Sequence, residues 1–390
     1  MTYQIKTFNA IAQSGLDAFN SNFQINQTDA ADAYLIRSVN LRDAQFPQTL
    51  KTIVRAGAGV NNVPLHRATE AGIAVFNTPG SNANAVKELV ISLMISASRN
   101  IFAANEYSND HVGADVSKRT EADKTKFNGT ELLGKKLAVI GLGHVGSLVA
   151  EAALELGMNV IGFDPYLSTD AAWNINNHVD RSRTIKQAVQ DADYVTIHVP
   201  KNDETDKLID RDVIAAMKPG VILFNYSRLG IVDNEVALEA VLDHKIKYYV
   251  TDFGEPIIAD QPNVIVTPHI GGSTLEAESN GATQAANTIM RYLETGDTVQ
   301  SVNLPGMKIP FEAPYRFTII HKNVPNMVGQ ITTILANIGI NIASMSNAAK
   351  KDTAYTIIDV DNLAADNSTE LLQKIDQIPE VYRARLIKHK

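Results

Sequence analysis

Short apolar runs alternate with helical patterns over roughly the first 300 residues of the chain. Each run is four to six residues long and ends near a polar residue or a glycine. Continuous apolar strands of this kind, separated by helices, are typical of a parallel sheet covered on both faces. We expect strands at 33–38, 52–56, 136–141, 160–163, 194–199, 221–226, 248–251 and 264–267, and a long apolar helix at 85–98.

Two segments break this pattern. Residues 111–126 are highly polar and have no apolar period, so we expect a surface loop there. Residues 303–314 contain three prolines and one glycine, a composition that predicts a linker.

A different pattern follows the linker. Strands are expected at 315–320, 341–347, 353–360 and 381–387. Between them, apolar residues at helical spacing predict two helices, the first marked by Val328, Ile331, Leu335 and Ile338, the second by Leu371, Leu372, Ile375 and Ile378. The order βαββαβ predicts a small ferredoxin-like sandwich.

Composition narrows the class of protein. The 390 residues predict two to four domains. The formal charge of -8 gives no general attraction for nucleic acid or an anionic membrane, and we expect neither as a partner. The absence of cysteine excludes disulfides, thiolate metal sites and cysteine nucleophiles, and no metal site is predicted. The polar N-terminus and the lack of an apolar run of ~20 residues predict a soluble, cytoplasmic protein.

The clearest motif is Gly141-Leu-Gly143-His-Val-Gly146, which follows an expected strand and opens an expected helix. Gly141 permits a tight turn, Gly143 lets the backbone approach a pyrophosphate, and Gly146 lets the helix pack close to the strand. The alternative is a structural glycine-rich turn. The strand before the motif and the helix after it favour a dinucleotide site.

An acidic residue supports this interpretation. Asp164 ends the next expected strand, 18 residues after Gly146, where a carboxylate can accept hydrogen bonds from the adenosine ribose. Pro165 and Tyr166 follow, with no adjacent arginine for a 2′-phosphate. We therefore expect NAD as the cofactor, in preference to NADP.

Three polar residues follow later strands, where open α/β sheets bind their ligands. Arg228 has a planar guanidinium that can hold a carboxylate through two parallel bonds, or it can form a structural ion pair. His269 can exchange a proton near neutral pH, or it can be a structural histidine. Glu255 can orient an imidazole, or it can be a solvated loop acid.

With these motifs, the chain resembles the D-isomer-specific 2-hydroxyacid dehydrogenase family, and most of all those members that act on 3-phosphoglycerate and carry a C-terminal ACT domain. The resemblance covers almost the whole chain. It is carried by RAGAGVNN (55–62), FNTPGSNANAVKELV (76–90), FNGTELLGKKLAVIGLGHVG (127–146), HVP (198–200), NYSRLGIVD (225–233) and TPHIGGST (267–274).

The resemblance implies two Rossmann-like parallel-sheet lobes and a ferredoxin-like ACT domain, an α/β fold as a whole. The implied order is a substrate lobe (1–95), an NAD-binding domain (96–272), the end of the substrate lobe (273–305), a linker (306–314) and an ACT regulatory domain (315–390).

The resemblance also implies residue roles. Arg228 would bind the substrate carboxylate, His269 would be the acid/base, and Glu255 would pair with His269. The family usually has D-x-F-x-x-E-P, whereas Asp252-Phe-Gly-Glu255-Pro256 is two residues shorter. The cofactor would contact Gly141, Gly143, His144, Val145, Gly146, Asp164, Tyr226, Ser227, Asp252, Gly271 and Gly272.

The implied substrate is 3-phospho-D-glycerate, oxidised in the first step of L-serine biosynthesis. Arg37 and Arg55 are candidates for the phosphate, or are structural, and backbone amides at Gly57 and Ala58 would face the carboxylate. Another D-2-hydroxy acid, such as 2-hydroxyglutarate, is an alternative substrate. A non-enzymatic NAD-sensing scaffold is an alternative of a different class, because fold alone does not imply activity.

The tail has a further implied role. ACT domains of this kind bind an amino acid between paired domains, so the resemblance implies a homo-oligomer with L-serine as an effector. The matching residues are His321, Asn323 and Asn341. The alternative is that the tail serves only for dimerisation.

Overall fold

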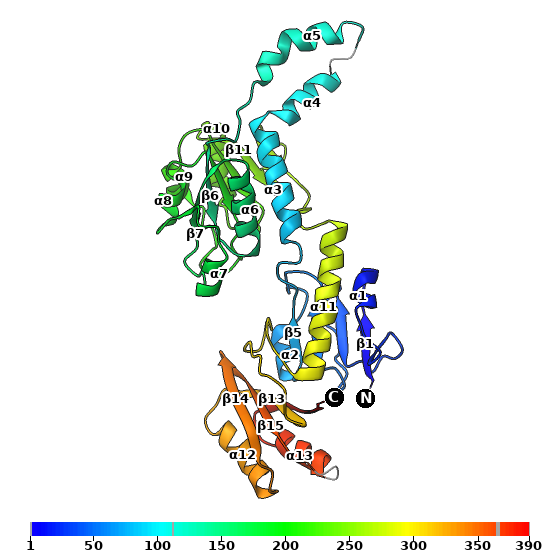
Figure 1. Cartoon of the computed structure of the whole chain (residues 1–390). Helices are drawn as coiled ribbons and strands as arrows, with labels where there is room; N and C mark the ends of the chain where they lie inside the picture. Colours follow the sequence, from blue (N-terminus) through cyan, green and yellow to red (C-terminus); the bar gives the residue numbers. More distant parts are fainter. Residues whose placement is uncertain (1, 111–112, 364–366, 390) are drawn as a thin grey trace. The chain divides into compact units, whose positions relative to one another are not determined.

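The computed structural model describes residues 2–110, 113–363 and 367–389. The chain divides into two compact units, Met1–Ser81 with Glu278–Lys390, and Asn82–Ala277. The first unit contains a five-stranded sheet and the C-terminal four-stranded sheet, and the second unit contains a seven-stranded sheet (Figure 1). Within the described residues, no helix is long and apolar enough to cross a membrane.

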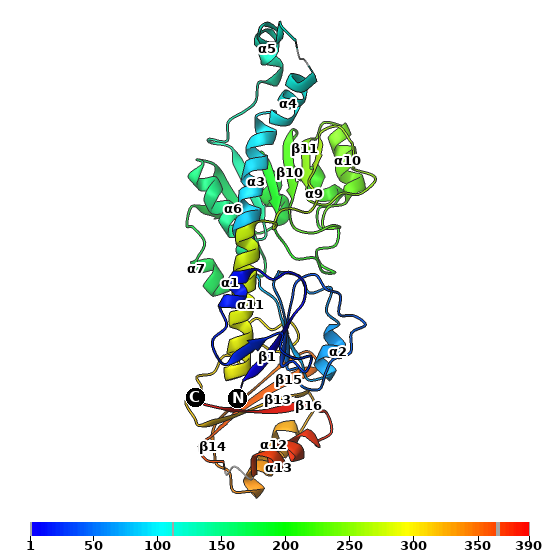
Figure 2. The ribbon, with the colours of Figure 1, turned by 90° about the vertical axis from the view of Figure 1, so that its right-hand side faces the viewer.

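In the first unit, one lobe is built on an entirely parallel sheet in the order β2-β1-β3-β4-β5. Helix α11 (Leu275–Thr295) packs on one face of this sheet and α2 (Leu65–Glu70) on the other (Figure 2). We call this part, with α1 (Gln13–Asp17), the first lobe. Its strands are β1 (Tyr3–Thr7), β2 (Phe23–Ile25), β3 (Ala33–Ile36), β4 (Thr52–Arg55) and β5 (Ala74–Phe76).

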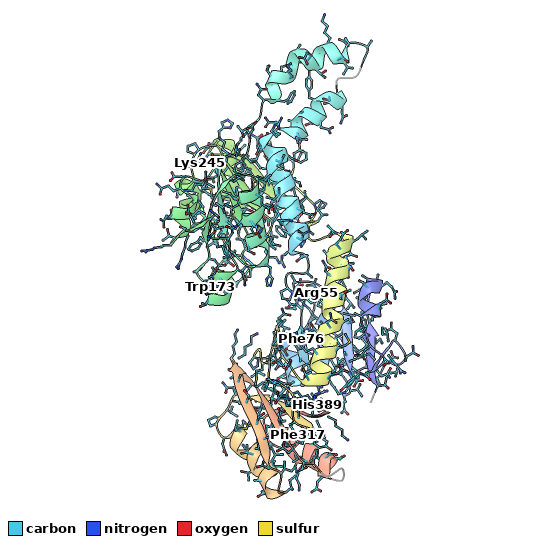
Figure 3. The ribbon with its side chains drawn as sticks, viewed as in Figure 1. Arg55, Phe76, Trp173, Lys245, Phe317 and His389 are labelled. Atoms are coloured by element: carbon cyan, nitrogen blue, oxygen red, sulfur yellow. The ribbon has the colours of Figure 1, made fainter. Side chains whose placement is uncertain are left out.

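The C-terminal domain has the βαββαβ order that the sequence predicts, and its strands pair in antiparallel fashion. Its sheet order is β14-β15-β13-β16, and its apolar residues pack beneath the two helices. Figure 3 shows Phe317 in this domain and Phe76 in the first lobe. The elements are β13 (Tyr315–Lys322), α12 (Met327–Asn337), β14 (Ile342–Lys350), β15 (Thr353–Val360), α13 (Asn367–Asp376) and β16 (Val381–Lys388).

The face of this sheet that α12 and α13 do not cover packs on the first lobe. Ile320, Tyr355 and Ile357 share one apolar cluster with Tyr292 and Leu293 of α11. The C-terminal domain and the first lobe therefore form a single compact unit rather than two tethered bodies.

The second unit has a parallel sheet in the order β12-β11-β10-β9-β6-β7-β8. Counted from β6, this is the doubly wound order of dinucleotide-binding sheets, and its direction reverses between β6 and β9. The strands are β6 (Lys136–Ile140), β7 (Asn159–Phe163), β8 (Val179–Arg181), β9 (Tyr194–Ile197), β10 (Val221–Asn225), β11 (Ile246–Thr251) and β12 (Val264–Val266).

Helices cover both faces of this sheet (Figure 1). One face packs against α3 (Ala83–Ser98) and α6 (His144–Glu155). The other packs against three shorter helices. These are α8 (Ile185–Val189), α9 (Arg211–Ala216) and α10 (Asn234–Leu242).

The prediction of a surface loop at 111–126 is wrong for most of that segment. Helix α5 (Val116–Asp123) and the 3-10 helix η1 (Lys124–Phe127) follow α4 (Ile101–Asp110), and residues 111–112 lie outside the described residues. No residue of α5 is buried. Because the helix packs no face against a core, its sequence shows no apolar residues at helical spacing, and the pattern did not predict it. Arg119 and Asp115 form an ion pair at helical spacing.

The boundaries between the units also differ from the predicted ones. The structure divides the chain at 81/82 and 277/278, whereas the predicted boundaries lie at 95/96 and 272/273. Helix α3 belongs to the second unit because Val90, Leu93, Met94 and Ala97 pack in the same cluster as residues of α6.

Candidate functional site

The turn between β6 and α6 is closely packed at Gly141 and Gly146 and open at Gly143. Gly141 has φ +92, and a Cβ there would lie 2.7 Å from the His198 carbonyl oxygen. A Cβ at Gly146 would lie 1.9 Å from the Gly141 oxygen, so neither position accepts a side chain. A Cβ at Gly143 would meet nothing within 4 Å. Helix α6 begins at His144, and such a helix N-terminus presents free amides to an anion.

A cavity of about 680 Å³ opens beside this turn, at the carboxyl ends of β6, β7 and β9. Its described lining includes Gly141, Gly143, Asp164 and Glu204, and contains neither lysine nor arginine. An acidic lining suits ribose hydroxyls and repels a 2′-phosphate. The cavity therefore fits the adenosine end of NAD better than that of NADP.

Asp164 is held at the edge of this cavity by two backbone amides. Its Oδ2 accepts from Leu142 N and its Oδ1 from Tyr166 N, both at 2.9 Å. The Tyr166 phenol donates to Glu204, and this bond raises the pKa of Tyr166. Each Asp164 oxygen keeps a lone pair that can accept from a ribose hydroxyl.

The three predicted catalytic residues follow neighbouring strands. Arg228 follows β10, Glu255 follows β11 and His269 follows β12. These strands are adjacent and parallel, so the three residues lie beyond the same edge of the sheet. This is the edge where open α/β sheets bind ligands.

The three side chains have separate surroundings. Arg228 is exposed and Nη1 donates to the Ser227 carbonyl at 2.7 Å. His269 is exposed, and its ring meets Phe253 edge to face at 5.0 Å. Glu255 Oε2 accepts from Asn234 Nδ2 at 2.5 Å. In the described chain, no hydrogen bond or ion pair joins the three to one another, so the pairing of Glu255 with His269 stays a prediction.

Several predicted cofactor contacts are engaged within the protein. Asp252 is 4% exposed and accepts from the Gly271 amide at 2.7 Å. The Tyr226 phenol bonds Thr267 Oγ1 at 2.9 Å, and Ser227 Oγ donates to the Val199 carbonyl. The hydroxyls of Tyr226 and Ser227 thus serve internal contacts. Val145 and Gly272 are partly exposed, and a Cβ at Gly272 would approach Asn82.

The predicted substrate residues lie in the first lobe. Arg37 forms an ion pair with Glu278 of α11, and Arg55 Nε donates to the Arg37 carbonyl at 2.8 Å. The Gly57 amide donates to Thr78 Oγ1 at 2.7 Å, and the Ala58 carbonyl accepts from Asn77. A phosphate at Arg37 would therefore compete with Glu278.

The predicted effector residues lie at opposite ends of the C-terminal sheet. His321 pairs with Ala354 at one end, whereas Asn341 precedes Ile342, which pairs with Val360 at the other. Six residues of strand correspond to about 20 Å. One effector molecule therefore cannot contact both residues of the same chain.

His321 is also sequestered. It is 2% exposed, and its ring nitrogens bond the Lys322 carbonyl at 2.7 Å and Thr356 Oγ1 at 2.9 Å. Burial lowers the pKa of His321. Asn323 and Asn341 are exposed.

Two residues that the sequence did not single out have defined positions here. Thr267 joins Tyr226 to Asp252, and Asn234 holds Glu255 while accepting from the Tyr249 phenol at 2.8 Å. Thr267 begins the TPHIGGST stretch, so its position two residues before His269 could have marked it as a candidate site residue. No motif in the sequence pointed to Asn234, because it begins α10 and lies outside the segment that contains Glu255.

Comparison with known proteins gives consistent results. Residues 91–271 match the family described as "D-isomer specific 2-hydroxyacid dehydrogenase, NAD binding domain". A D-3-phosphoglycerate dehydrogenase of Haemophilus influenzae is 30% identical over 98% of this chain and 94% of its own length. The enzyme of that name from Methanocaldococcus jannaschii is 37% identical over 77% of this chain. The chain spans only 57% of that relative's length.

Solved structures show the same fold. D-mandelate dehydrogenase of Rhodotorula graminis matches with a TM-score of 0.65 at 20% identity, over 79% of this chain and 99% of that one. An NAD+-bound 3-phosphoglycerate dehydrogenase of Entamoeba histolytica matches with a TM-score of 0.60 at 24% identity, over 78% of this chain and 99% of that one. With the full-length match to the Haemophilus relative, the chain belongs to the D-isomer-specific 2-hydroxyacid dehydrogenase family.

Proposed function

We propose that the protein oxidises 3-phospho-D-glycerate to 3-phosphohydroxypyruvate with NAD. The observation that carries the proposal is the placement of Arg228, Glu255 and His269 after three adjacent parallel strands. The acidic cavity at the glycine-rich turn of the same sheet supports it. The relatives named D-3-phosphoglycerate dehydrogenase favour this substrate among 2-hydroxy acids.

The residues divide the chemistry as follows. His269 accepts the proton of the substrate hydroxyl during oxidation and returns it during reduction. Arg228 pairs with the substrate carboxylate and orients the reacting carbon. Glu255 favours the protonated form of His269 if it approaches the ring when substrate binds. Bound NAD supplies the acceptor for the hydride.

The test is NADH oxidation with 3-phosphohydroxypyruvate, compared with 2-oxoglutarate. Turnover of the phosphorylated acid with the higher kcat/KM supports the proposal. A preference for 2-oxoglutarate would assign a different 2-hydroxy acid. NADH binding without turnover of either acid would favour the sensing scaffold.

Cofactor choice should depend on Asp164. We expect Asp164→Ala to raise the KM for NADH and to reduce the NADH/NADPH ratio of kcat/KM by about 10–100-fold, since one charge-assisted hydrogen bond contributes about 1.5–3 kcal/mol. The ratio is measured from initial rates with both cofactors. A wild-type protein that prefers NADPH would contradict the assignment.

Asp164→Asn removes the charge and nearly keeps the size of the side chain. Asparagine carries no charge and keeps one oxygen acceptor, for the amide of either Leu142 or Tyr166, with an NH2 group in place of the other oxygen. If repulsion by the charge decides the preference, both variants should accept NADPH better than the wild type. If neither variant does so, repulsion by this charge does not set the preference.

We also propose that L-serine binds between two C-terminal domains of a homo-oligomer. Because His321 and Asn341 lie at opposite ends of one sheet, a site that uses residues from both ends needs two chains. Asn323 and Asn341 are exposed amides, which offer a donor and an acceptor to an amino acid.

L-serine is expected to inhibit the enzyme, and Asn341→Ala to weaken inhibition without changing the uninhibited kcat. A coupling free energy of about 1–3 kcal/mol gives clear feedback. Calorimetric titration of the full chain and activity at millimolar serine measure both effects. Asn20→Ala, at an exposed site in the first lobe, is the control and should leave inhibition unchanged. If the wild type shows neither heat of binding nor inhibition, the C-terminal domain serves only for assembly.

A further inference from the structure

The turn that carries His269 is attached to a single buried aspartate. Two consecutive amides donate to the Asp252 carboxylate, Ile270 N to Oδ1 at 2.9 Å and Gly271 N to Oδ2 at 2.7 Å. The His269 amide lies 2.9 Å from the Thr267 carbonyl and 3.1 Å from the Asp252 carbonyl. His269 has φ +56, in the left-handed region, so this turn needs such support. The position of the Asp252 carboxylate therefore fixes the backbone on which His269 stands.

The Thr267 hydroxyl bonds that carboxylate directly, and the Tyr226 hydroxyl bonds Thr267. Thr267 Oγ1 lies 2.5 Å from Asp252 Oδ1 and 3.4 Å from the Thr251 carbonyl, so the shorter bond takes its proton. The Tyr226 phenol lies 2.9 Å from Thr267 Oγ1. Since Thr267 has given its one proton to Asp252, Tyr226 is the donor. Burial raises the pKa of the Tyr226 phenol, which keeps that donor protonated.

This chain of bonds crosses three strands. Tyr226 follows β10, Asp252 follows β11 and Thr267 follows β12. Tyr226 stands two residues before Arg228, and Thr267 two residues before His269. The packing is close: a Cβ at Gly271 would lie 3.0 Å from Asp252 Oδ2 and 3.4 Å from the Tyr226 ring. The loop that bears Arg228 is thus tied to the loop that bears His269.

We propose that Tyr226 and Thr267 are positioning residues that act through Asp252 to hold His269 in register with Arg228. The inference rests on the proposed function, because it assumes that these two groups meet the substrate. It assigns the Tyr226 hydroxyl to the protein interior rather than to the cofactor.

Thr267→Val tests the proposal, because valine keeps the shape and removes the hydroxyl. A small displacement of a catalytic group lowers turnover strongly, so we expect kcat to fall by about 10–100-fold while the KM for NADH stays within about twofold. Thr267→Ser keeps the hydroxyl and should restore most of kcat. Tyr226→Phe should have a smaller effect of the same kind, about threefold, because Thr267 still donates to Asp252. Thr288→Val, which removes a buried hydroxyl from α11, is the matched control and should leave kcat unchanged.

A second measurement does not depend on turnover. Hydrogen exchange of a peptide covering 264–273 should show the amides of Ile270 and Gly271 exchanging about tenfold faster in Thr267→Val, because their acceptor has lost its support. Unchanged exchange, unchanged kcat, or a loss that appears in the KM for NADH instead of kcat would each overturn the proposal. A wild type without turnover would refute the proposed function, and exchange would still show whether Thr267 supports the turn.

Discussion

Replacement of His269 by alanine is expected to lower kcat with 3-phosphohydroxypyruvate by about 10²–10⁴-fold, the usual contribution of a general acid or base. The affinity for NADH should stay close to that of the wild type, because the glycine-rich turn and Asp164 lie on other loops. The single tryptophan is Trp173, which is labelled in Figure 3. It stands two residues after Ala171, which lines the cavity. Energy transfer from Trp173 to NADH therefore measures binding separately from turnover.

The backbone at this position calls for a second variant. Alanine is strained at the φ of +56 that His269 adopts, whereas asparagine tolerates the left-handed region. His269→Asn should therefore lose turnover without disturbing the turn. His178→Ala, at an exposed site in the same unit, is the control and should keep full activity. A change in kcat of less than about threefold in both His269 variants would show that another group moves the proton.

The parallel sheets could be predicted from the sequence because their strands are buried on both faces. Strand β10 is buried at every position, and it stands in the sequence as the continuous apolar run VILF followed by Asn225. The order of the strands comes from the structure, and the glycine motif follows β6, next to which the order reverses. The parallel sheet and the glycine-rich turn can therefore be predicted from short stretches of sequence.

The contacts of Glu255 could not be predicted. The shortened segment from Asp252 to Glu255 leaves this carboxylate bonded to Asn234, the first residue of α10. That partner lies 21 residues away in sequence, and no local pattern connects the two. The shorter segment indicates that the Glu255 carboxylate takes a different position from that usual in the family. It does not indicate which residue the carboxylate contacts there.

The contact between the C-terminal sheet and the first lobe was hidden for a different reason. Along β13, Phe317 and Ile319 face the two helices, whereas Arg316 and Thr318 alternate with them. Polar residues in alternation suggest a solvated face. In the structure both are buried against the first lobe, at 0% and 1% exposed. Sequence alternation alone cannot distinguish a solvated polar face from a buried one whose polar groups are satisfied.

Arg316 is the central group of that contact. Its Nε and Nη2 donate to the two carboxylate oxygens of Asp359 at 2.7 and 2.8 Å. Its remaining donors reach the carbonyls of Thr295, Ile309 and Pro310, at the end of α11 and in the linker. One guanidinium thus joins the C-terminal sheet to the chain that enters it, with every N–H group paired.

Arg316→Met is expected to destabilise the first unit by about 3–5 kcal/mol, because it leaves the buried Asp359 carboxylate without its cation. Replacing both members of the pair, as Arg316→Met with Asp359→Leu, should recover most of that loss, since no unpaired charge then remains. Hydrogen exchange of peptides from β13 and β15 under increasing denaturant measures the effect in this unit alone, which a global melt of a chain with several domains does not.

Lys374→Met provides the matched control, because Lys374 pairs with Glu370 on the exposed side of α13 in the same domain. An exposed pair of this kind contributes about 0.3–0.5 kcal/mol, so this variant should exchange almost like the wild type. If Arg316→Met were equally mild, the C-terminal domain would not depend on the buried pair for its contact with the first lobe. If the single variant is severe and the double variant mild, the unpaired charge is the cause. The domain would then be fixed to the first lobe by satisfied polar groups, and an effector bound there would act on one rigid unit.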